Sequence, residues 1–205
     1  MPDPRRFSKV RSISFDFDGV LSTLVLGRRW AKTRARRPPN PIIAEVARAL
    51  RTGLNGLTQG LRKPYPDAED VLRGLRSSGR ILYLLTSLTA ERIAGAERWL
   101  DRYGWRGFFD RLFFNTAGKD ADDFKEAILQ AHPVDVHVDD DPQTITRLSP
   151  LFPDMIFIHL DHRGRGGAEG VNVVVAQGWE DLSGLFLVGP GARADGLRPG
   201  SPGRA

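Results

Sequence analysis

Acidic side chains and one hydroxyl follow three separate apolar segments of the chain. In chain order they are Asp16 and Asp18, Thr86, and the consecutive Asp139, Asp140 and Asp141. Carboxylates that are held close together repel one another unless a cation neutralises them. The chain has no cysteine, so a metal ion would need oxygen or imidazole ligands, and oxygen ligands favour Mg²⁺. The residue types therefore predict a magnesium site that can bind an anionic group.

The apolar segments before these polar residues have the length and composition of buried strands. Helical patterns alternate with them: one around Val71 to Leu75 and two that we expect to be capped by Thr89 and Asp122. About five strands interleaved with helices predict an α/β fold, a doubly wound, Rossmann-like and mostly parallel sheet. In such sheets ligands bind beyond the carboxyl ends of the strands, where the acids and Thr86 are expected to meet.

Composition divides the chain into three parts. We expect a catalytic core from residues 1–21 and 64–188, interrupted by a small, mainly helical cap or lid insertion at 22–63. The insertion contains ten Lys and Arg residues against the single acid Glu45. Residues 189–205 are dominated by Gly, Pro, Arg and Ala and are predicted to be a disordered tail.

Overall composition limits the class of protein. The 205 residues are 40% hydrophobic, which is enough for one sizeable core, and the formal net charge is +5. No apolar run approaches the roughly 20 residues that cross a bilayer. We therefore expect a cytoplasmic protein without a membrane partner, and the net charge alone does not identify its partner.

Three of these segments resemble motifs of the haloacid dehalogenase-like (HAD) superfamily. The segment Ser-Phe-Asp16-Phe-Asp18-Gly-Val-Leu looks like the first motif, an apolar strand followed by Asp-x-Asp-Gly. Tyr-Leu-Leu-Thr86 is similar to the second motif, and His-Val-Asp139-Asp140-Asp-Pro to the fourth. The order of the three along the chain also agrees. The third motif is a lysine before the acidic strand, for which Lys125 and Lys119 compete, and we favour Lys125.

The resemblance implies a role for each of these residues. Asp16 would be the nucleophile that forms a phosphoaspartate, and Asp18 would exchange the proton with the leaving oxygen and then with water. Thr86, Ser87 and Lys125 would bind the phosphoryl oxygens. The Mg²⁺ ligands would be Asp16, the backbone carbonyl of Asp18, Asp139 and Asp140. One of the three consecutive acids is also expected to cap the helix after Pro142, and which of them contact the metal stays open.

These assignments predict a magnesium-dependent phosphomonoester hydrolase that acts on a small anionic metabolite or a nucleotide. Because Asp18 is present, whereas dehalogenating members lack the second acid of the first motif, carbon–halogen chemistry is not expected. The basic insertion supports an alternative, a nucleic-acid-binding or nucleic-acid-end-processing protein. Trp30 is a base-stacking candidate within it. Substrate identity and oligomeric state stay open.

Overall fold

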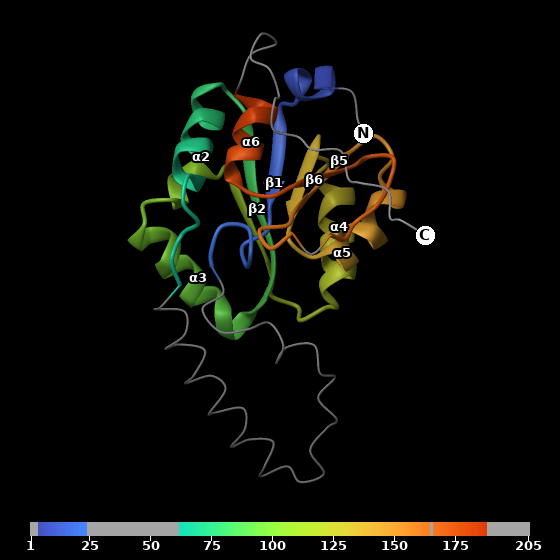
Figure 1. The fold of residues 1–205 in the computed structure, drawn as a ribbon. Coiled ribbons are helices and arrows are strands. Elements are labelled where there is room, and N and C mark those ends of the chain that lie inside the picture. The colour runs from blue at the N-terminus through green and yellow to red at the C-terminus, as the bar shows by residue number, and fades with distance from the viewer. Residues whose placement is uncertain (1–3, 24–61, 165, 188–205) are drawn as a thin grey trace.

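The computed structural model describes residues 4–23, 62–164 and 166–187 (Figure 1). The predicted tail at 189–205 and most of the predicted insertion at 22–63 lie outside these residues. Both ends of the insertion are described, and they are hydrogen-bonded to each other. The backbone N–H of Thr23 donates to the carbonyl of Lys63 at 2.8 Å, and Ser22 forms an antiparallel bridge with Pro64. The insertion therefore leaves the core and returns to it at a single place.

The core of the protein is a six-stranded, fully parallel sheet. Its strands are β1 (Ser12–Phe15), β2 (Ile81–Thr89), β3 (Arg111–Asn115), β4 (Val136–Asp139), β5 (Ile156–Leu160) and β6 (Val173–Ala176). This confirms the expected doubly wound fold, with one strand more than the expected count of about five. β3 pairs with β2 alone and forms one edge of the sheet.

In the strand order β3-β2-β1-β4-β5-β6, the direction in which successive strands are added to the sheet changes between β1 and β4. The chain starts at β1, builds outward through β2 and β3, and then returns to pair β4 with the other side of β1. Such a reversal opens a crevice at the carboxyl ends of the two central strands. In Figure 1 these ends lie at the lower edge of the sheet.

Helices cover both faces of the sheet (Figure 1). The described helices are η1 (Pro4–Lys9), α2 (Ala68–Ser77), α3 (Ala90–Arg102), η3 (Arg106–Phe108), α4 (Ala121–Ala131), α5 (Pro142–Leu148), η4 (Ser149–Leu151) and α6 (Trp179–Phe186). Buried side chains of α2, α3 and α6 pack with Phe15 in one apolar cluster, and those of α4 and α5 pack with Phe157 in a second. Burial of these two apolar layers is the main stabilising contribution to the fold.

The start of α4 differs from the sequence-based expectation. Asp122 was expected to cap this helix, but the N-cap is Asp120, whose carboxylate accepts the backbone N–H of Asp122 at 3.1 Å. The helix therefore begins at Ala121, and Lys125 lies on its buried side next to Phe124. Thr89 does stand at the N-cap of α3, although its side chain makes no capping hydrogen bond there.

Within the described ranges, no helix has the length and apolar character that crossing a bilayer requires.

Candidate active site

The crevice between β1 and β4 is where the predicted acids meet. The backbone N–H of Asp16 donates to the carbonyl of Val138 at 2.9 Å, which fixes the end of β1 against the end of β4. Side chains alternate along a strand, so Asp16 and Asp139 face away from the layer that contains Phe15 and Val138. They therefore point toward the face that α4 covers.

Lys125 of α4 reaches these two acids. Its Nζ lies 3.0 Å from Oδ1 of Asp16 and 2.5 Å from Oδ2 of Asp139, and all three side chains are buried. Lys119 is exposed, and its backbone is held by Asn115, whose Oδ1 accepts the Lys119 N–H at 2.9 Å. Of the two competing lysines, the structure places Lys125 at the carboxylates.

One ammonium shared by two buried acids perturbs the protonation of all three groups. Burial raises the pKa of Asp16 to about 7, against the lowering effect of Lys125 and with the help of the neighbouring Asp139. Burial alone would also raise the pKa of Asp139, but Lys125 and His137 hold it below its ordinary value. Burial opposes the charged form of Lys125, yet Asp139 and Asp16 keep its pKa above the usual range. Lys125 thus offsets the negative charge of Asp139 more completely than that of Asp16.

A third acid completes an oxygen-rich site that fits a metal ion. Asp16, Asp139 and Asp140 each offer a carboxylate oxygen, and these oxygens lie within 4.8 Å of one another. Three carboxylates of this kind are ligands that suit Mg²⁺. An additional divalent charge would also offset the charge on Asp16 that Lys125 leaves incompletely compensated. The donor set therefore fits the expected metal.

Gly19 allows Asp140 to approach the loop that follows β1. The φ of Gly19 is +86°, a left-handed conformation that glycine adopts without strain. A Cβ at this position would lie only 2.2 Å from Oδ2 of Asp140. The glycine of the first motif is thus required both by the backbone conformation and by the packing of a candidate ligand.

The side chain of Asp18 is not one of the three clustered carboxylates; the predicted metal contact of Asp18 is through its backbone carbonyl, and its carboxylate has other partners. Its two carboxylate oxygens form ion pairs with two arginines, Oδ1 with Arg62 and Oδ2 with Nη2 of Arg92 at 3.0 Å. In the sequence Arg62 stands out only as one basic residue of the insertion, and Arg92 is not among the predicted site residues. The position of Arg92 was a usable signal, since it lies in the first turn of the helix after β2, which borders the crevice.

Two further residues, which were not predicted as site residues, contact Asp139 or its neighbour from inside the sheet. His137 Nε2 lies 3.3 Å from Oδ2 of Asp139, and His137 Nδ1 lies 2.8 Å from the hydroxyl of Ser14. Burial lowers the pKa of His137, which favours the neutral imidazole. With Ser14 donating to Nδ1, the remaining N–H is directed at Asp139. His137 is two residues before Asp139 on the same strand, so strand alternation could have identified it.

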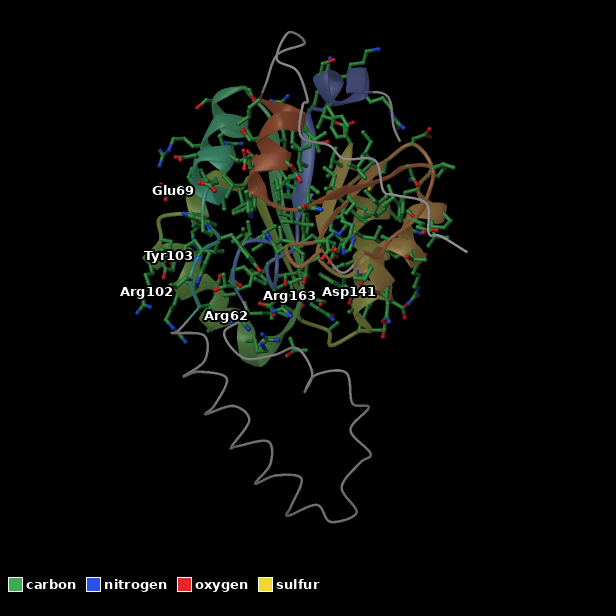
Figure 2. All side chains as sticks on the ribbon, in the orientation of Figure 1. Arg62, Glu69, Arg102, Tyr103, Asp141 and Arg163 are labelled. Carbon is green, nitrogen blue, oxygen red and sulfur yellow. The ribbon has the colours of Figure 1, made fainter. Side chains whose placement is uncertain are left out.

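The remaining predicted residues lie on neighbouring elements. Thr86 is buried and Ser87 half-buried on β2, the strand next to β1. Asp141 caps α5, because its Oδ1 accepts the Gln143 N–H at 3.1 Å, while its own N–H donates to Asp139 at 2.9 Å. It is therefore Asp141 that caps the helix after Pro142. Figure 2 shows Asp141 and Arg62 near the same edge of the molecule.

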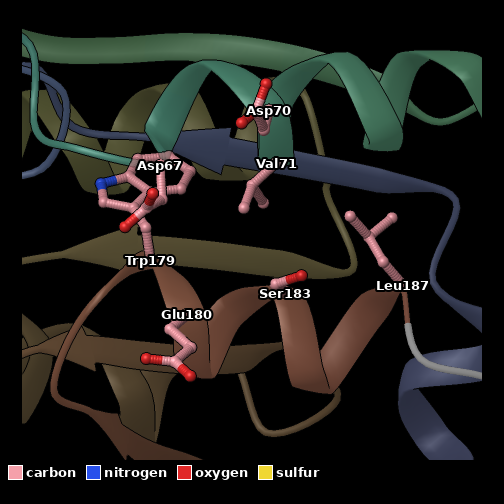
Figure 3. A pocket seen from close by; sticks show the side chains of 7 residues that line it. All are labelled: Asp67, Asp70, Val71, Trp179, Glu180, Ser183 and Leu187. Carbon is pink, nitrogen blue, oxygen red and sulfur yellow. The ribbon is translucent and has the colours of Figure 1, made fainter.

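A separate cavity of about 420 Å³ lies between α2 and α6 (Figure 3). Asp67, Asp70 and Glu180 contribute to its lining, together with apolar side chains, and no member of the Asp16 cluster does so. Three carboxylates repel a phosphate ester electrostatically. This cavity is therefore a poor match for the anionic ligand that the crevice suits.

The chain resembles known proteins in structure, whereas no family model and no curated protein sequence matches it. CbbY from Rhodobacter sphaeroides, solved in complex with phosphate, has a TM-score of 0.60 at 15% identity, covering 84% of this chain and 96% of CbbY. YfnB from Bacillus subtilis, bound to magnesium, has a TM-score of 0.58 at 11% identity, covering 87% and 99%.

A dehalogenase shares the same architecture. The L-2-haloacid dehalogenase RSc1362 has a TM-score of 0.59 at 18% identity, covering 87% of this chain and 99% of that protein. Further matching structures are described as haloacid dehalogenase-like hydrolases. At such low identities the likeness establishes architecture. The polypeptide therefore has the fold of the haloacid dehalogenase-like superfamily.

Proposed function

We propose that this protein is a magnesium-dependent phosphomonoester hydrolase in which Asp16 is a covalent nucleophile. The observation that carries the proposal is the buried group formed by Asp16, Lys125 and Asp139, with the Asp140 carboxylate alongside. This group lies at the strand reversal between β1 and β4, where doubly wound folds bind their ligands.

Each residue of the site has a definite part in the proposed reaction. An oxygen of Asp16 attacks phosphorus, a bond forms between them, and the bond from phosphorus to the leaving oxygen breaks as Asp18 gives that oxygen a proton. Water then attacks phosphorus, Asp18 takes up a proton from the water, and the bond between Asp16 and phosphorus breaks. This sequence releases inorganic phosphate and returns both carboxylates to their starting state.

The other side chains stabilise charge during both steps. Lys125 keeps a positive charge next to Asp16, while Thr86 and Ser87 on the adjacent strand supply hydroxyl donors for the phosphoryl oxygens. Asp16, Asp139 and Asp140 would hold Mg²⁺, with the backbone carbonyl of Asp18 as a further ligand. The bound ion would supply positive charge to the nucleophile and the phosphoryl group.

Known structures of this fold support the proposal without choosing between reactions. CbbY was solved with phosphate and YfnB with magnesium, whereas RSc1362 is a dehalogenase. Asp18 favours phosphoryl transfer, because this chemistry needs a second acid that can exchange a proton with a leaving oxygen. We infer a small anionic metabolite or a nucleotide as substrate. The nucleic-acid alternative rests on the basic insertion, most of which lies outside the described residues.

Hydrolysis of an aryl phosphate, such as 4-nitrophenyl phosphate, tests the proposal. Wild-type protein should release phosphate with Mg²⁺ and not with EDTA, and Asp16→Asn should lower kcat by about 10³-fold or more, because the amide is a far weaker nucleophile. Asp70→Asn, in the separate cavity between α2 and α6, is the matched control and should remain active. Full activity of Asp16→Asn, or no magnesium-dependent release across a broad panel of phosphate esters, would refute the mechanism.

A further inference from the structure

A line of three polar side chains leads from β1 to the carboxylates through the interior of the sheet. Ser14, His137 and Asp139 are all buried, and the ring of His137 contacts the other two. Strand register places Ser14 directly opposite His137. Ser14 precedes Asp16 by two residues, as His137 precedes Asp139, so the four side chains lie on one face of the sheet. The proposed reaction steps assign no role to Ser14 or His137.

The hydrogen bonds of His137 agree with a single form of its ring. Its Nε2 lies 3.3 Å from Oδ2 of Asp139, the same oxygen that contacts the Lys125 ammonium. The ring is neutral, because burial disfavours a charge on it and Lys125 would repel that charge. An ionised carboxylate only accepts hydrogen bonds, so Nε2 carries the proton. Nδ1 is then the acceptor, and the Ser14 hydroxyl donates to it at 2.8 Å.

The surroundings of the His137 ring keep it in this orientation. The ring meets Phe157 of β5 edge to face, with centroids 6.0 Å apart and an interplanar angle of 83°. Oγ of Ser14 also lies 3.5 Å from the carbonyl oxygen of Val136, a distance at the limit of a hydrogen bond, so His137 is its closer partner. Turning the ring would give up the hydrogen bonds on both of its nitrogens.

Both oxygens of Asp139 are held as a result. Oδ1 accepts the backbone N–H of Asp141 at 2.9 Å, and Oδ2 accepts from Lys125 and His137. The carboxylate therefore cannot rotate without losing a hydrogen bond. Nζ of Lys125 lies 2.5 Å from Oδ2 of Asp139 and 3.0 Å from Oδ1 of Asp16. The orientation of His137 thus affects where the ammonium lies beside Asp16.

We propose that Ser14 and His137 are positioning residues that fix Asp139, and through it Lys125, with the proton of His137 on Nε2. The importance of this arrangement for catalysis rests on the proposed function, in which Lys125 stabilises charge on the phosphoryl oxygens. Such stabilisation is effective when the charge is already in place before the reaction. A loosely held Asp139 would leave the Lys125 ammonium less well placed.

Nitrogen-15 NMR of the histidine side chains, recorded in EDTA, tests the proton position without the reaction. The protonated and unprotonated nitrogens of a neutral imidazole give well-separated signals, and those of His137 are assigned by their loss in His137→Gln. Wild-type protein at pH 7 should carry the proton on Nε2. Ser14→Ala should shift the Nδ1 signal, because its hydrogen bond is lost. A proton on Nδ1 in the wild type, or an unchanged Nδ1 signal in Ser14→Ala, would refute the inference.

Hydrolysis of 4-nitrophenyl phosphate with Mg²⁺ tests the positioning role. His137→Leu should lower kcat by about 10-fold or more, because no donor remains for Asp139. His137→Gln keeps an N–H near the place of Nε2 and should restore most of the activity. Ser14→Ala should lower kcat by about 5-fold, the size expected for one lost hydrogen bond. In the His137→Gln background Ser14→Ala should have no effect, since the glutamine amide does not need the serine hydroxyl.

A second buried serine provides the matched control. Ser149→Ala, in η4, should keep wild-type kcat and the wild-type nitrogen-15 signals of His137. Thermal melting of each variant shows that it is folded. Equal losses from Ser14→Ala in both backgrounds would refute the inference, because Ser14 would then act independently of His137. An equal loss in His137→Gln and His137→Leu would also refute it, because the N–H would not be the group that matters.

The outcomes distinguish this inference from the proposed function. If wild-type protein hydrolyses the ester but the variants give either pattern of equal losses, the positioning role fails and the hydrolase stands. If wild-type protein hydrolyses no phosphate ester with Mg²⁺, the proposed function fails, and the role in catalysis fails with it. The nitrogen-15 spectra then still decide whether Ser14 and His137 hold Asp139 as described.

Discussion

Asp16 and Asp18 are two residues apart, yet the structure gives them different surroundings. Asp16 is buried against Lys125 and Asp139, under a helix that approaches from one face of the sheet. Asp18 is 19% exposed and contacts Arg62 and Arg92, which come from the end of the insertion and from α3. The first group is enclosed, and one ammonium is shared between its two carboxylates. The second is more exposed to water.

The largest expected difference between the two regions is in how much the free energy of unfolding falls when a cationic side chain is replaced. Lys125→Met should destabilise the protein by about 3–5 kcal/mol, because buried carboxylates lose their compensating charge. Arg92→Met should cost less than about 1 kcal/mol, because its ion pair is partly exposed to water. Urea unfolding of both variants without metal measures the two costs. Equal losses of unfolding free energy in the two variants would show that burial does not distinguish the two regions.

A smaller effect is expected where the two regions are joined, at Gly19. Gly19→Ala should lower stability by about 2 kcal/mol and weaken Mg²⁺ binding, because the added Cβ overlaps Asp140 as well as straining the backbone. Gly79→Ala is the matched control, since Gly79 has a φ of +80° but no atom within 4 Å of the added Cβ. It should cost about 1 kcal/mol and leave metal binding unchanged. Calorimetric titration with Mg²⁺ and thermal melting give both readouts. Equal losses in the two variants would contradict the close packing of Asp140.

The last effect concerns pH, and above about pH 4 it is expected to come from Asp16. Its pKa is raised from the ordinary 3.8 to about 7, so between these values the folded protein holds a proton that the unfolded chain releases. Stability without metal should therefore fall as pH rises from about 4 to 7, by roughly 1–3 kcal/mol. Asp139, with its lowered pKa, adds stability that is lost only as pH falls below about 4.

Urea midpoints measured in EDTA at several pH values test this dependence. Asp16→Asn should remove most of the decline, because the amide does not titrate. Stabilisation by Mg²⁺ should grow over the same range, since the ion and the proton compete for Asp16. A flat profile in the wild type, or an unchanged decline in Asp16→Asn, would assign the pH dependence to other groups.

The sequence was informative wherever a short local pattern determines structure. Apolar runs predicted the strands, and Asp16 and Asp139 could be placed at strand ends because parallel strands end at one edge of a sheet. The cap of α4 was predicted two residues too late, because Asp120 and Asp122 are both acceptable N-caps and only the backbone geometry distinguishes them. The choice of Lys125 over Lys119 likewise had competing local arguments.

Residues that act through tertiary contacts were harder to identify. Arg92 is one of many arginines in the chain; its place in the first turn after β2 indicates a residue near the crevice but does not identify Asp18 as its partner. Strand alternation places His137 on the same face as Asp139, whereas its contact with Ser14 depends on the pairing of β1 with β4. The sequence by itself determined the doubly wound fold and the acids at the strand ends, since strand periodicity and motif spacing are local. Only the tertiary structure decided which cationic side chain forms an ion pair with which acid, because that depends on how α3, α4 and the end of the insertion pack around one crevice.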